Sequence, residues 1–510
     1  MSDWIKSTIG DVFDVVGGGT PSTEKAEYWK GPIPWITSAD IDEHSRITPR
    51  KAISEKAVKD SATSKVPAGS VVVVTRVGLG KVGIAETDLC FSQDCQGLLF
   101  DQQSLEPKFV AHQLVGATKR FHEISRGTTI NGVTKKQLLS TPFYVAPRSE
   151  QKRVVDKLEE LLTDLEAGAA ALERARANLK RYRAAVLKAA VEGRLTEKWR
   201  AAHPDIEPAE KLLERILAER RKKWEEAQLK KFAEKKQAPP KGWKDKYSEP
   251  VKPDVAELPK LPEGWCWASW SEIGLSQNGR PFPSKEYSDI GAKLLRPGNL
   301  YATGAVGWTQ KNTKCLPESY ALENPDLIVG GGELVMNLTA QSLKDEFLGR
   351  ICITANDERC LLNQRLARLT PILISPQFIL WLFKSAHFRK FVAGLNAGSL
   401  IQHMFTSQLE EFVLPLPPIE EQSAIVLETG RLLSICDAVE VQMNRDGYRS
   451  ARLRQAILKR AFEGKLVPQD PKDEPAGELL ARIRAERTDQ VAAGRGRGKI
   501  RKKIRQKTRK

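Results

Sequence analysis

Two stretches of the chain decide its fold: SEQKRVVDKLEELL (149–162) and AVLKAAVEGRL (185–195). Both recur 271 residues later, as EEQSAIVLETGRLL (420–433) and AILKRAFEGKL (456–466). Two collinear matches at one offset do not arise by chance, and self-similarity at a long period marks a repeated structural unit. We therefore expect two copies of one unit, each a globular domain of about 150 residues followed by a long helix.

The repeated stretches belong to a heptad pattern. Residues 150–195 contain no proline, and their apolar or small residues recur at alternating steps of four and three. This spacing predicts a coiled-coil seam on a helix about 70 Å long, with Ser149 as N-cap and a stop at Gly193. One seam cannot bury itself, so we expect the two helices to pack on each other; the alternative is that each packs only on its own globular domain. The expected packing residues are Leu158, Leu161, Leu165, Leu172, Leu179, Leu432, Val439, Leu453 and Ile457.

The globular halves mix strand and helix signals. VVVVTRV (71–77) predicts a strand, and Pro107 begins a helix that is predicted over 107–124. The second half repeats this order, with a strand over 330–338 and a helix over 376–392. We therefore predict the α+β class, with a twisted sheet in each half.

Two segments carry the net charge of +17. Residues 211–246 hold thirteen Lys/Arg against six acids, and residues 494–510 hold ten Lys/Arg and no acid. A third match, PAEKLLERILAER (208–220) with PAGELLARIRAER (475–487), introduces both segments. Lys and Arg displace counterions from DNA, so the tail is either a phosphate contact or a solubilising extension. The first segment reads as a helix that continues into a Pro-rich linker ending near residue 261.

One motif invites a cofactor interpretation that we reject. Residues 78–83 match GxGxxG after a strand, the pattern of a dinucleotide or S-adenosylmethionine site. The next residues, IAETDLC (84–90), read as another strand and not as the start of a helix. The equivalent FLGRICI (347–353) lacks two of the three glycines. A β-turn between two strands explains both copies better.

Motifs for catalysis are missing. The sequence has no GxxxxGK[ST], HExxH, GxSxG or Asn/Asp-Pro-Pro-aromatic pattern, and its six His show no metal spacing. The seven Cys form no CxxC pair, which favours free thiols in a reducing cytoplasm. No run of about 18 apolar residues is present, so we expect a cytoplasmic chain without a membrane span. We expect no catalysis, no metal and no cofactor on this chain; the alternatives are a fused methyltransferase or nuclease, and a coiled-coil scaffold that binds only proteins.

Candidate DNA contacts are polar residues in loops. Arg and Lys recognise guanine, and Asn and Gln recognise adenine. The loops that follow Gly127 and Gly398 lie at equivalent places in the two halves, which favours them as reading loops. The candidates are Arg76, Lys81, Arg126, Thr128, Asn131, Lys135, Arg296, Asn299, Asn337, Gln341, Lys344 and Gln402.

The chain resembles the specificity subunits of type I restriction–modification systems. The resemblance lies in Pro-x-x-Glu-Gln before each helix (147–151 and 418–422) and in the helix ends AVLKAAVEGRLTEKW (185–199) and AILKRAFEGKLVPQD (456–470). The turn TRVGLGKVGI and the strands FYVAP and VLPLPP are also similar to target recognition domains of that family. It covers roughly residues 1–200 and 262–487; the stretch 211–261 and the tail after 488 depart from the pattern.

The resemblance implies a division of labour. Two target recognition domains each read half of a split, asymmetric DNA sequence, and two antiparallel helices set the gap between the halves. Modification subunits, two in number, dock on the helices and bring S-adenosylmethionine. Restriction subunits bring ATP and Mg²⁺, and the complex methylates adenine or cleaves unmodified DNA.

The expected domain organisation follows from the repeat and the resemblance. It consists of a first recognition domain (1–148), the central conserved helix (149–200), a basic helix and Pro-rich linker (201–261), a second recognition domain (262–418), the C-terminal conserved helix (419–467), and a helical segment with a basic tail (468–510).

Overall fold

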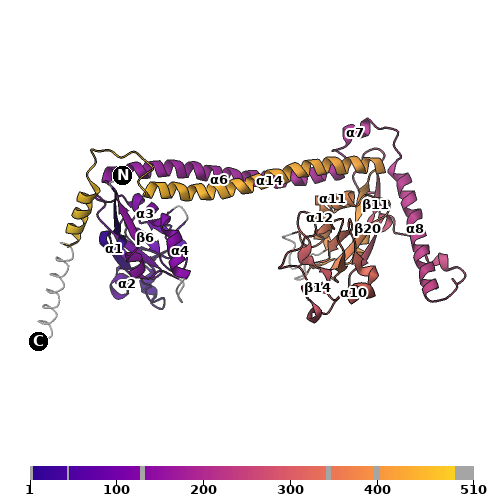
Figure 1. Cartoon of the computed structure of the whole chain (residues 1–510), viewed down its shortest axis with the longest axis horizontal. Coiled ribbons are helices and arrows are strands. Elements are labelled where there is room, and N and C mark those ends of the chain that lie inside the picture. Colours follow the sequence, from indigo (N-terminus) through magenta and orange to yellow (C-terminus); the bar gives the residue numbers. More distant parts are fainter. Residues whose placement is uncertain (1–3, 43–44, 127–131, 341–345, 396–401, 489–510) are drawn as a thin grey trace. The chain divides into compact units, whose positions relative to one another are not determined.

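The computed structural model describes residues 4–42, 45–126, 132–340, 346–395 and 402–488 (Figure 1). The chain divides into two compact units. The first unit consists of Met1–Glu173 and Asn444–Lys510, and the second unit of Arg174–Met443. Each contains one sheet-rich head and parts of both long helices, so the two halves of the repeat exchange segments to build each unit.

The first head, residues 4–147, contains two four-stranded sheets and a strand pair. The inner sheet is antiparallel, in the order β2 (Asp14–Gly17), β9 (Cys95–Leu99), β6 (Val71–Val74), β7 (Val82–Ile84). The outer sheet has the order β4 (Lys51–Ile53), β3 (Ile33–Ile36), β8 (Leu89–Phe91), β5 (Lys65–Val66), and its β3 and β8 are parallel. The pair joins β1 (Ile5–Thr8) to β10 (Pro142–Val145).

The second head, residues 265–418, repeats this topology strand for strand. Its inner sheet has the order β12 (Gly274–Asn278), β20 (Leu366–Pro371), β16 (Leu334–Asn337), β18 (Ile351–Ile353). Its outer sheet has the order β14 (Cys315–Leu316), β13 (Ala292–Leu295), β19 (Cys360–Leu362), β15 (Ile328–Val329), again with one parallel pair, β13 with β19. Strands β11 (Cys266–Ser269) and β22 (Val413–Leu416) pair antiparallel, and a short pair, β17 (Thr339–Ala340) with β21 (Gln402–His403), is added. The duplication read from the sequence is therefore a duplication of fold.

Short helices pack on both sheets of each head, α2 and α10 on the outer sheets and the others on the inner side. In the first head they are α1 (Ile9–Val12), α2 (Glu55–Asp60), α3 (Pro107–Gly116), α4 (Thr118–Arg126) and α5 (Lys135–Leu139). In the second head they are α9 (Trp270–Ile273), α10 (Glu318–Glu323), α11 (Pro376–Lys384), α12 (Ala386–Leu395) and α13 (Thr406–Glu410). Proline stands in the first turn of both α3 and α11, where its missing N–H costs nothing. The single helices predicted over 107–124 and 376–392 are thus each broken into two.

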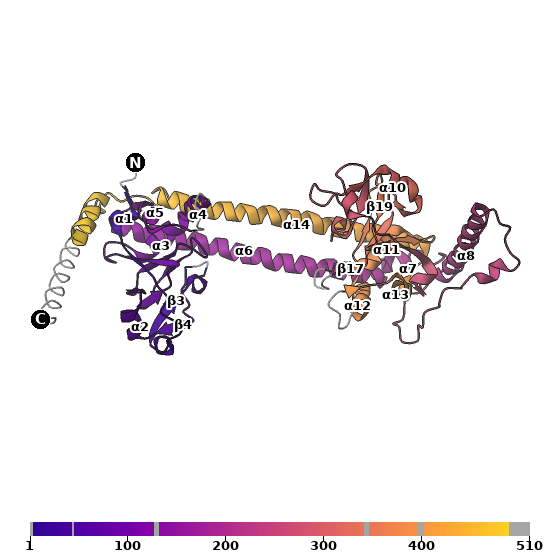
Figure 2. The same cartoon turned by 90° about the horizontal axis from the view of Figure 1, so that it is seen from below.

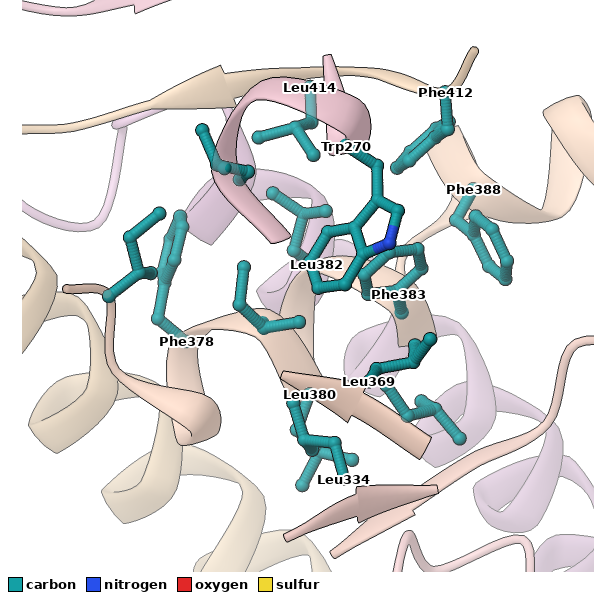
Figure 3. Packing of buried hydrophobic residues seen from close by; sticks show 14 of the residues in the cluster. Trp270, Leu334, Leu369, Phe378, Leu380, Leu382, Phe383, Phe388, Phe412 and Leu414 are labelled. Carbon is teal, nitrogen blue, oxygen red and sulfur yellow. The ribbon is translucent and has the colours of Figure 1, made fainter. Parts of the chain in front are cut away.

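The central strand of each inner sheet explains the packing. Side chains alternate across a strand, and all four residues of β6 are fully buried. Val71 and Val73 join the core beneath the helices, while Val72 and Val74 join the core between the two sheets. In the second head Leu334 and Met336 face the helices in the same way (Figure 3), where the Trp270 and Phe383 rings meet edge to face at 5.2 Å. An apolar run at this place follows from burial on both faces.

The two long helices are α6 (Arg148–Val191) and α14 (Ile419–Phe462), and they pack antiparallel in both units. Of the predicted seam residues of α6, Leu158 is fully buried, and Leu161, Leu165, Leu172 and Leu179 are half-buried; Leu162, which lies off the seam, is buried as well. On α14, Leu432 and Ile457 are half-buried, but Val439 and Leu453 stay exposed at 38% and 48%. The middle of the pair is thus thinly packed, as the polar Asp446 and Ser450 on the seam indicate.

The start of the expected central helix differs from the sequence prediction, and its end agrees with it. The helix begins at Arg148, so Ser149 lies inside the first turn; its hydroxyl donates to the Asp473 carboxylate and does not cap. The stop at Gly193 is confirmed, since α6 ends at Val191 and Gly193 has a φ of +68°. A side chain there would also collide with Arg200 and Pro262, so the turn demands glycine.

Helices beyond α6 and α14 return to the heads. After α6 come α7 (Glu197–Ala201), α8 (Ala209–Glu234) and a short turn, η3 (Trp243–Lys246). In the first unit, a helix over 476–488 packs on the first head through Leu479, Leu480 and Ile483. No helix of the described residues is long and apolar enough to cross a membrane.

Candidate nucleic-acid interface

In the first head, three loops meet at one end of the inner sheet. The β6–β7 hairpin turn carries Arg76, which is exposed. The Val133 N–H donates to the Thr75 carbonyl at 2.8 Å, which brings the loop before α5 against this turn. The Lys81 ammonium donates to the Ser38 and Ile41 carbonyls at 3.2 and 2.9 Å, which ties in a loop of the outer sheet. We call this set of loops the first loop cluster.

The second head builds the same cluster. The Met404 N–H donates to the Leu338 carbonyl at 3.0 Å, as Val133 does to Thr75. Arg350 takes the place of Lys81, and its guanidinium donates to the Leu300 carbonyl at 3.2 Å. This is the second loop cluster. The fold therefore gathers loops that are far apart in sequence at equivalent ends of both heads, and the described candidates Arg76, Lys81 and Arg296 lie on these loops.

The candidate residues that the structure describes have different structural roles. Lys135 is exposed, and its ammonium donates to the Val15 carbonyl at 2.6 Å, holding α5 to β2. Arg296 is half-buried; its guanidinium lies 5.7 Å over the Tyr287 ring. Arg76 is exposed like Lys135, and Lys81 is half-buried.

Two candidates belong to the framework of the loops. Asn299 is fully buried, and its side-chain oxygen accepts from the Arg296 N–H at 3.0 Å. Asp40 caps the equivalent turn of the first head by accepting from the Thr37 N–H at 2.7 Å. Asn337 is also fully buried, and its amide donates to the Thr339 and Phe347 carbonyls. We therefore withdraw Asn299 and Asn337 from the set of DNA contacts, because their amides already satisfy the backbone.

The remaining candidates fall in stretches that the structure leaves out. Thr128, Asn131, Gln341 and Lys344 lie outside the described residues, as do the side chains of Arg126 and Gln402.

A basic cleft of about 580 Å³ lies where α6 meets the second head. Arg176, Lys180 and Arg183 line it from α6, and Lys384 and Arg389 from the head. Burial lowers the pKa of Lys384, and it lowers the pKa of Arg389 to about 10. Both side chains donate hydrogen bonds to backbone carbonyls; Lys384 donates to those of Ala302 and Thr303. They hold loops in place beneath the cleft.

The Gln of each Pro-x-x-Glu-Gln motif fastens a long helix to its head. The Gln151 amide donates to the Ser104 and Ala146 carbonyls at 3.3 and 2.8 Å, and its oxygen accepts from the Glu106 N–H at 2.8 Å. Gln422 does the same with the Pro417 carbonyl at 3.1 Å and the Ser375 N–H at 3.4 Å. The sequence shows the motif but not that its Gln fastens the helix to the head.

The Glu of each motif is buried in the same junction. Glu421 is fully buried; it accepts from the Thr196 hydroxyl at 2.6 Å, the Trp265 indole at 2.8 Å and the Arg200 guanidinium at 3.0 Å. Glu150 is 1% exposed in the first unit, and burial raises its pKa against the opposing hydrogen bond from Trp4. A glutamate in a first helical turn is usually explained by the helix dipole alone, so its partners could not be read from sequence.

One ion pair recurs at equivalent places between the long helices. In the second unit Arg183 pairs with Asp437 and, at 2.8 Å, with Glu440. In the first unit Arg454 pairs with Glu166 at 3.5 Å. Since 454 − 183 and 437 − 166 both equal 271, the two pairs are copies of one contact. Their match could have been found by combining the repeat offset with the charges.

Possible metal ligands and cysteine thiols can be compared among the residues that the structure describes. Within them, no three His, Cys, Asp or Glu gather as they would around a metal ion. Burial raises the pKa of Cys95, Cys352 and Cys360 to about 12, so these thiols stay protonated and are poor nucleophiles. The GxGxxG segment is a turn between β6 and β7, as predicted.

Comparisons with known proteins agree with this architecture. Residues 1–174 match the family model described as type I restriction modification DNA specificity domain. The chain is 26% identical over 418 residues to the EcoDI type I restriction enzyme specificity subunit of Escherichia coli, covering 78% of this chain and 80% of that protein. It is 26% identical over 523 residues to the EcoKI specificity subunit of Escherichia coli strain K12, covering 98% of both.

A solved structure has the same fold. A chain described under complex assembly and conformational transition of the type I R-M system aligns with a TM-score of 0.60 at 17% identity, over 91% of this chain and 98% of that one. Fold, duplication and relatives together define a specificity subunit, the non-catalytic DNA recognition component of a larger enzyme. Over nearly its whole length the chain is similar to type I restriction–modification specificity subunits, and residues 1–174 match the DNA specificity domain of that family.

Proposed function

We propose that the chain reads a bipartite, asymmetric DNA sequence, one half through each loop cluster. The observation that carries the proposal is the duplication: both heads have one topology and gather equivalent loops, yet the side chains on those loops differ. Exposed Arg76 in the first cluster has the chemistry to recognise guanine in the major groove. Two dissimilar readers of this kind recognise two different half-sequences.

The proposal includes partner subunits. Modification subunits, two of them, would dock on the paired helices and supply S-adenosylmethionine, and restriction subunits would supply ATP and Mg²⁺. The target adenine would be flipped out of the duplex into a pocket of a modification subunit, beside the S-adenosylmethionine that this subunit supplies. Exposed apolar side chains on α14, such as Leu427 and Tyr448 at 76% each, leave a surface for such partners.

Exchange of one head tests the proposal. Residues 1–145 are replaced by those of another recognition domain, the chain is assembled with its modification subunits, and bound sequences are selected from randomised duplexes. We expect one half of the consensus to change and the other half to persist. A simultaneous change in both halves, or no bipartite consensus with the unaltered chain, would contradict the proposal.

The length of the helix pair provides a second test. Insertion of one heptad after Leu172 and one after Met443 lengthens the pair by about 10 Å, since a helix rises 1.5 Å per residue. We expect the gap between half-sites to grow by about three base pairs. The same insertion between Pro239 and Pro240, in the linker, is the control and leaves the gap unchanged. An unchanged gap in the helix variant means that the helices do not set it.

A further inference from the structure

The segment that departs from the family pattern forms an arm on the second head. The first part of α8 belongs to the core of that head, with Ala209, Leu212 and Ile216 fully buried in one cluster with Trp265. This packed part of α8 ends at Arg220, whose guanidinium donates to the Gly274 carbonyl at 2.8 Å. Beyond Arg220, α8 continues to Glu234 on the flank of the head, in both views (Figures 1 and 2). We call residues 221–251 the basic arm.

The basic arm is braced along its length. After α8 the chain turns back, and Trp243 stacks on Trp224 at 5.9 Å while Tyr247 meets Trp224 at 5.3 Å. Two ion pairs join α8 to the chain that turns back along it: Lys244 with Glu225 at 2.7 Å, and Arg221 with Glu249 at 3.5 Å. The end of the arm is fixed to the head, because the Ser269 hydroxyl donates to the Val251 carbonyl. A loose linker would need none of these contacts.

The bracing leaves lysines outside it. The acids Glu225 and Glu249 are used by the cations of the brace. The side chains of Lys223, Lys230 and Lys231 are exposed and form no ion pair with any residue that the structure describes. Lys222 lies 4.0 Å from Glu219 and is 66% exposed. The acids Glu226 and Glu234 are exposed among these lysines on α8, but ten Lys/Arg against five Asp/Glu over 221–251 leave the braced arm with a net charge of +5.

The first unit shares this placement of charge. Arg487 is the repeat equivalent of Arg220; its guanidinium donates to the Gly10 carbonyl at 2.9 Å and pairs with Asp14 at 3.0 Å. After Arg487 the sequence turns basic again, with ten Lys/Arg and no acid over 494–510. The two extensions share no sequence pattern. Positive charge after the same anchoring arginine is what they have in common.

We propose that the basic arm binds the phosphate backbone of double-stranded DNA beside the half-site that the second head reads. The inference rests on the proposed function, which brings DNA to that head. Phosphate contacts by lysine neutralise the backbone and release counterions, so they add affinity and orient the protein without reading sequence. The arm thus strengthens DNA binding by the second head without adding to its specificity.

Salt dependence of binding tests the inference. The full chain with Lys222, Lys223, Lys230 and Lys231 changed to Gln keeps good helix formers throughout α8. The matched control changes the same four residues to Arg and keeps every charge. Binding to a duplex of random sequence is measured over a series of KCl concentrations. We expect the slope of log K against log salt to fall by about two to four in the Gln variant, at roughly 0.9 per lost contact, and to stay unchanged in the Arg variant.

The outcomes separate the arm from the rest of the function. An unchanged slope in the Gln variant overturns the inference, and loss of modification subunits from that variant in a pull-down would then identify the arm as a protein-docking surface. Selection on randomised duplexes gives an independent readout, in which the Gln variant recovers the consensus of the unaltered chain. If the unaltered chain recovers no consensus, the proposed function fails, while the salt slopes still decide whether the arm binds DNA.

Discussion

The two head–helix junctions share one motif but differ in how the charge of its buried glutamate is compensated. In the second unit, the buried Glu421 meets Arg200, so a charge removed from water has a matched partner. In the first unit, the attraction of Arg153 lowers the pKa of the similarly buried Glu150, but Arg153 forms its ion pair with Asp473 at 2.7 Å. Burial then prevails and raises the pKa of Glu150. The motif thus specifies where the carboxyl group lies, and the residues after each long helix decide how well its charge is compensated.

The largest effect is expected from breaking the compensated junction. Glu421→Gln leaves Arg200, only 18% exposed, without its carboxylate, and we expect the second unit to lose about 3 kcal/mol of unfolding free energy. Chemical denaturation followed by hydrogen exchange of β11 measures the loss. Glu420→Gln, on the exposed neighbour, is the control and is expected to change stability by less than about 0.5 kcal/mol. Equal effects of the two variants would show that the pair with Arg200 is unimportant.

Removal of a helix-fastening amide comes next. Gln151→Ala leaves two carbonyls and one N–H of the first head without partners, and we expect a cost of about 2 kcal/mol in the first unit. Gln422→Ala breaks one bond of 3.1 Å and one of 3.4 Å, so a smaller loss is expected in the second unit. Denaturation midpoints of the two variants give the ranking, and the reverse order would contradict it.

The duplicated ion pairs are expected to matter less. Arg183 is 32% exposed and its acidic partners are more exposed still, so solvent screens the attraction. We expect Arg183→Gln to cost up to about 1 kcal/mol and Arg454→Gln, with one partner at 3.5 Å, to cost about half of that. Both losses should shrink when the denaturation is repeated at high salt. A loss that persists at high salt would indicate that packing, and not charge, is responsible.

The smallest effect is expected at Glu150, and it differs in sign. A carboxyl group whose folded pKa is raised contributes stability below its ordinary pKa of 4.5, and this contribution is lost as the pH rises through the raised value. Glu150→Gln removes the titration, so the first unit should become slightly more stable at neutral pH and less dependent on pH above about 4.5. Thermal midpoints over a pH series check this. A loss of stability at neutral pH would show that the hydrogen bond with Trp4 outweighs burial.

The periodicity of apolar residues predicted most of the fold. The heptad pattern predicted both long helices and their seam, because burial along one stripe is a local property of the sequence. The apolar run 71–74 predicted the central strand for the same reason. The offset of 271 predicted the duplication, and it would have predicted the paired ions as well.

Individual site residues were harder, because their roles depend on contacts made across the fold. Asn299 has the chemistry of a base-reading residue, yet it caps a turn just as Asp40 does in the other head. Lys81 looked like a guanine contact, and its ammonium ties two loops together. The partners of Glu421 come from three separate parts of the chain, which no local pattern brings together.

The helix over 476–488 determines when the core of the first head can be completed during translation. Leu479, Leu480 and Ile483 complete a core whose other members, such as Ile9 and Phe109, are synthesised hundreds of residues earlier. At elongation rates of about 5–20 residues per second, that interval is roughly 20 to 70 s. During that time a nascent chain exposes an apolar face that only its own later part can cover. Chaperone binding to ribosome-held chains should therefore persist at this head and end only when the late helix emerges.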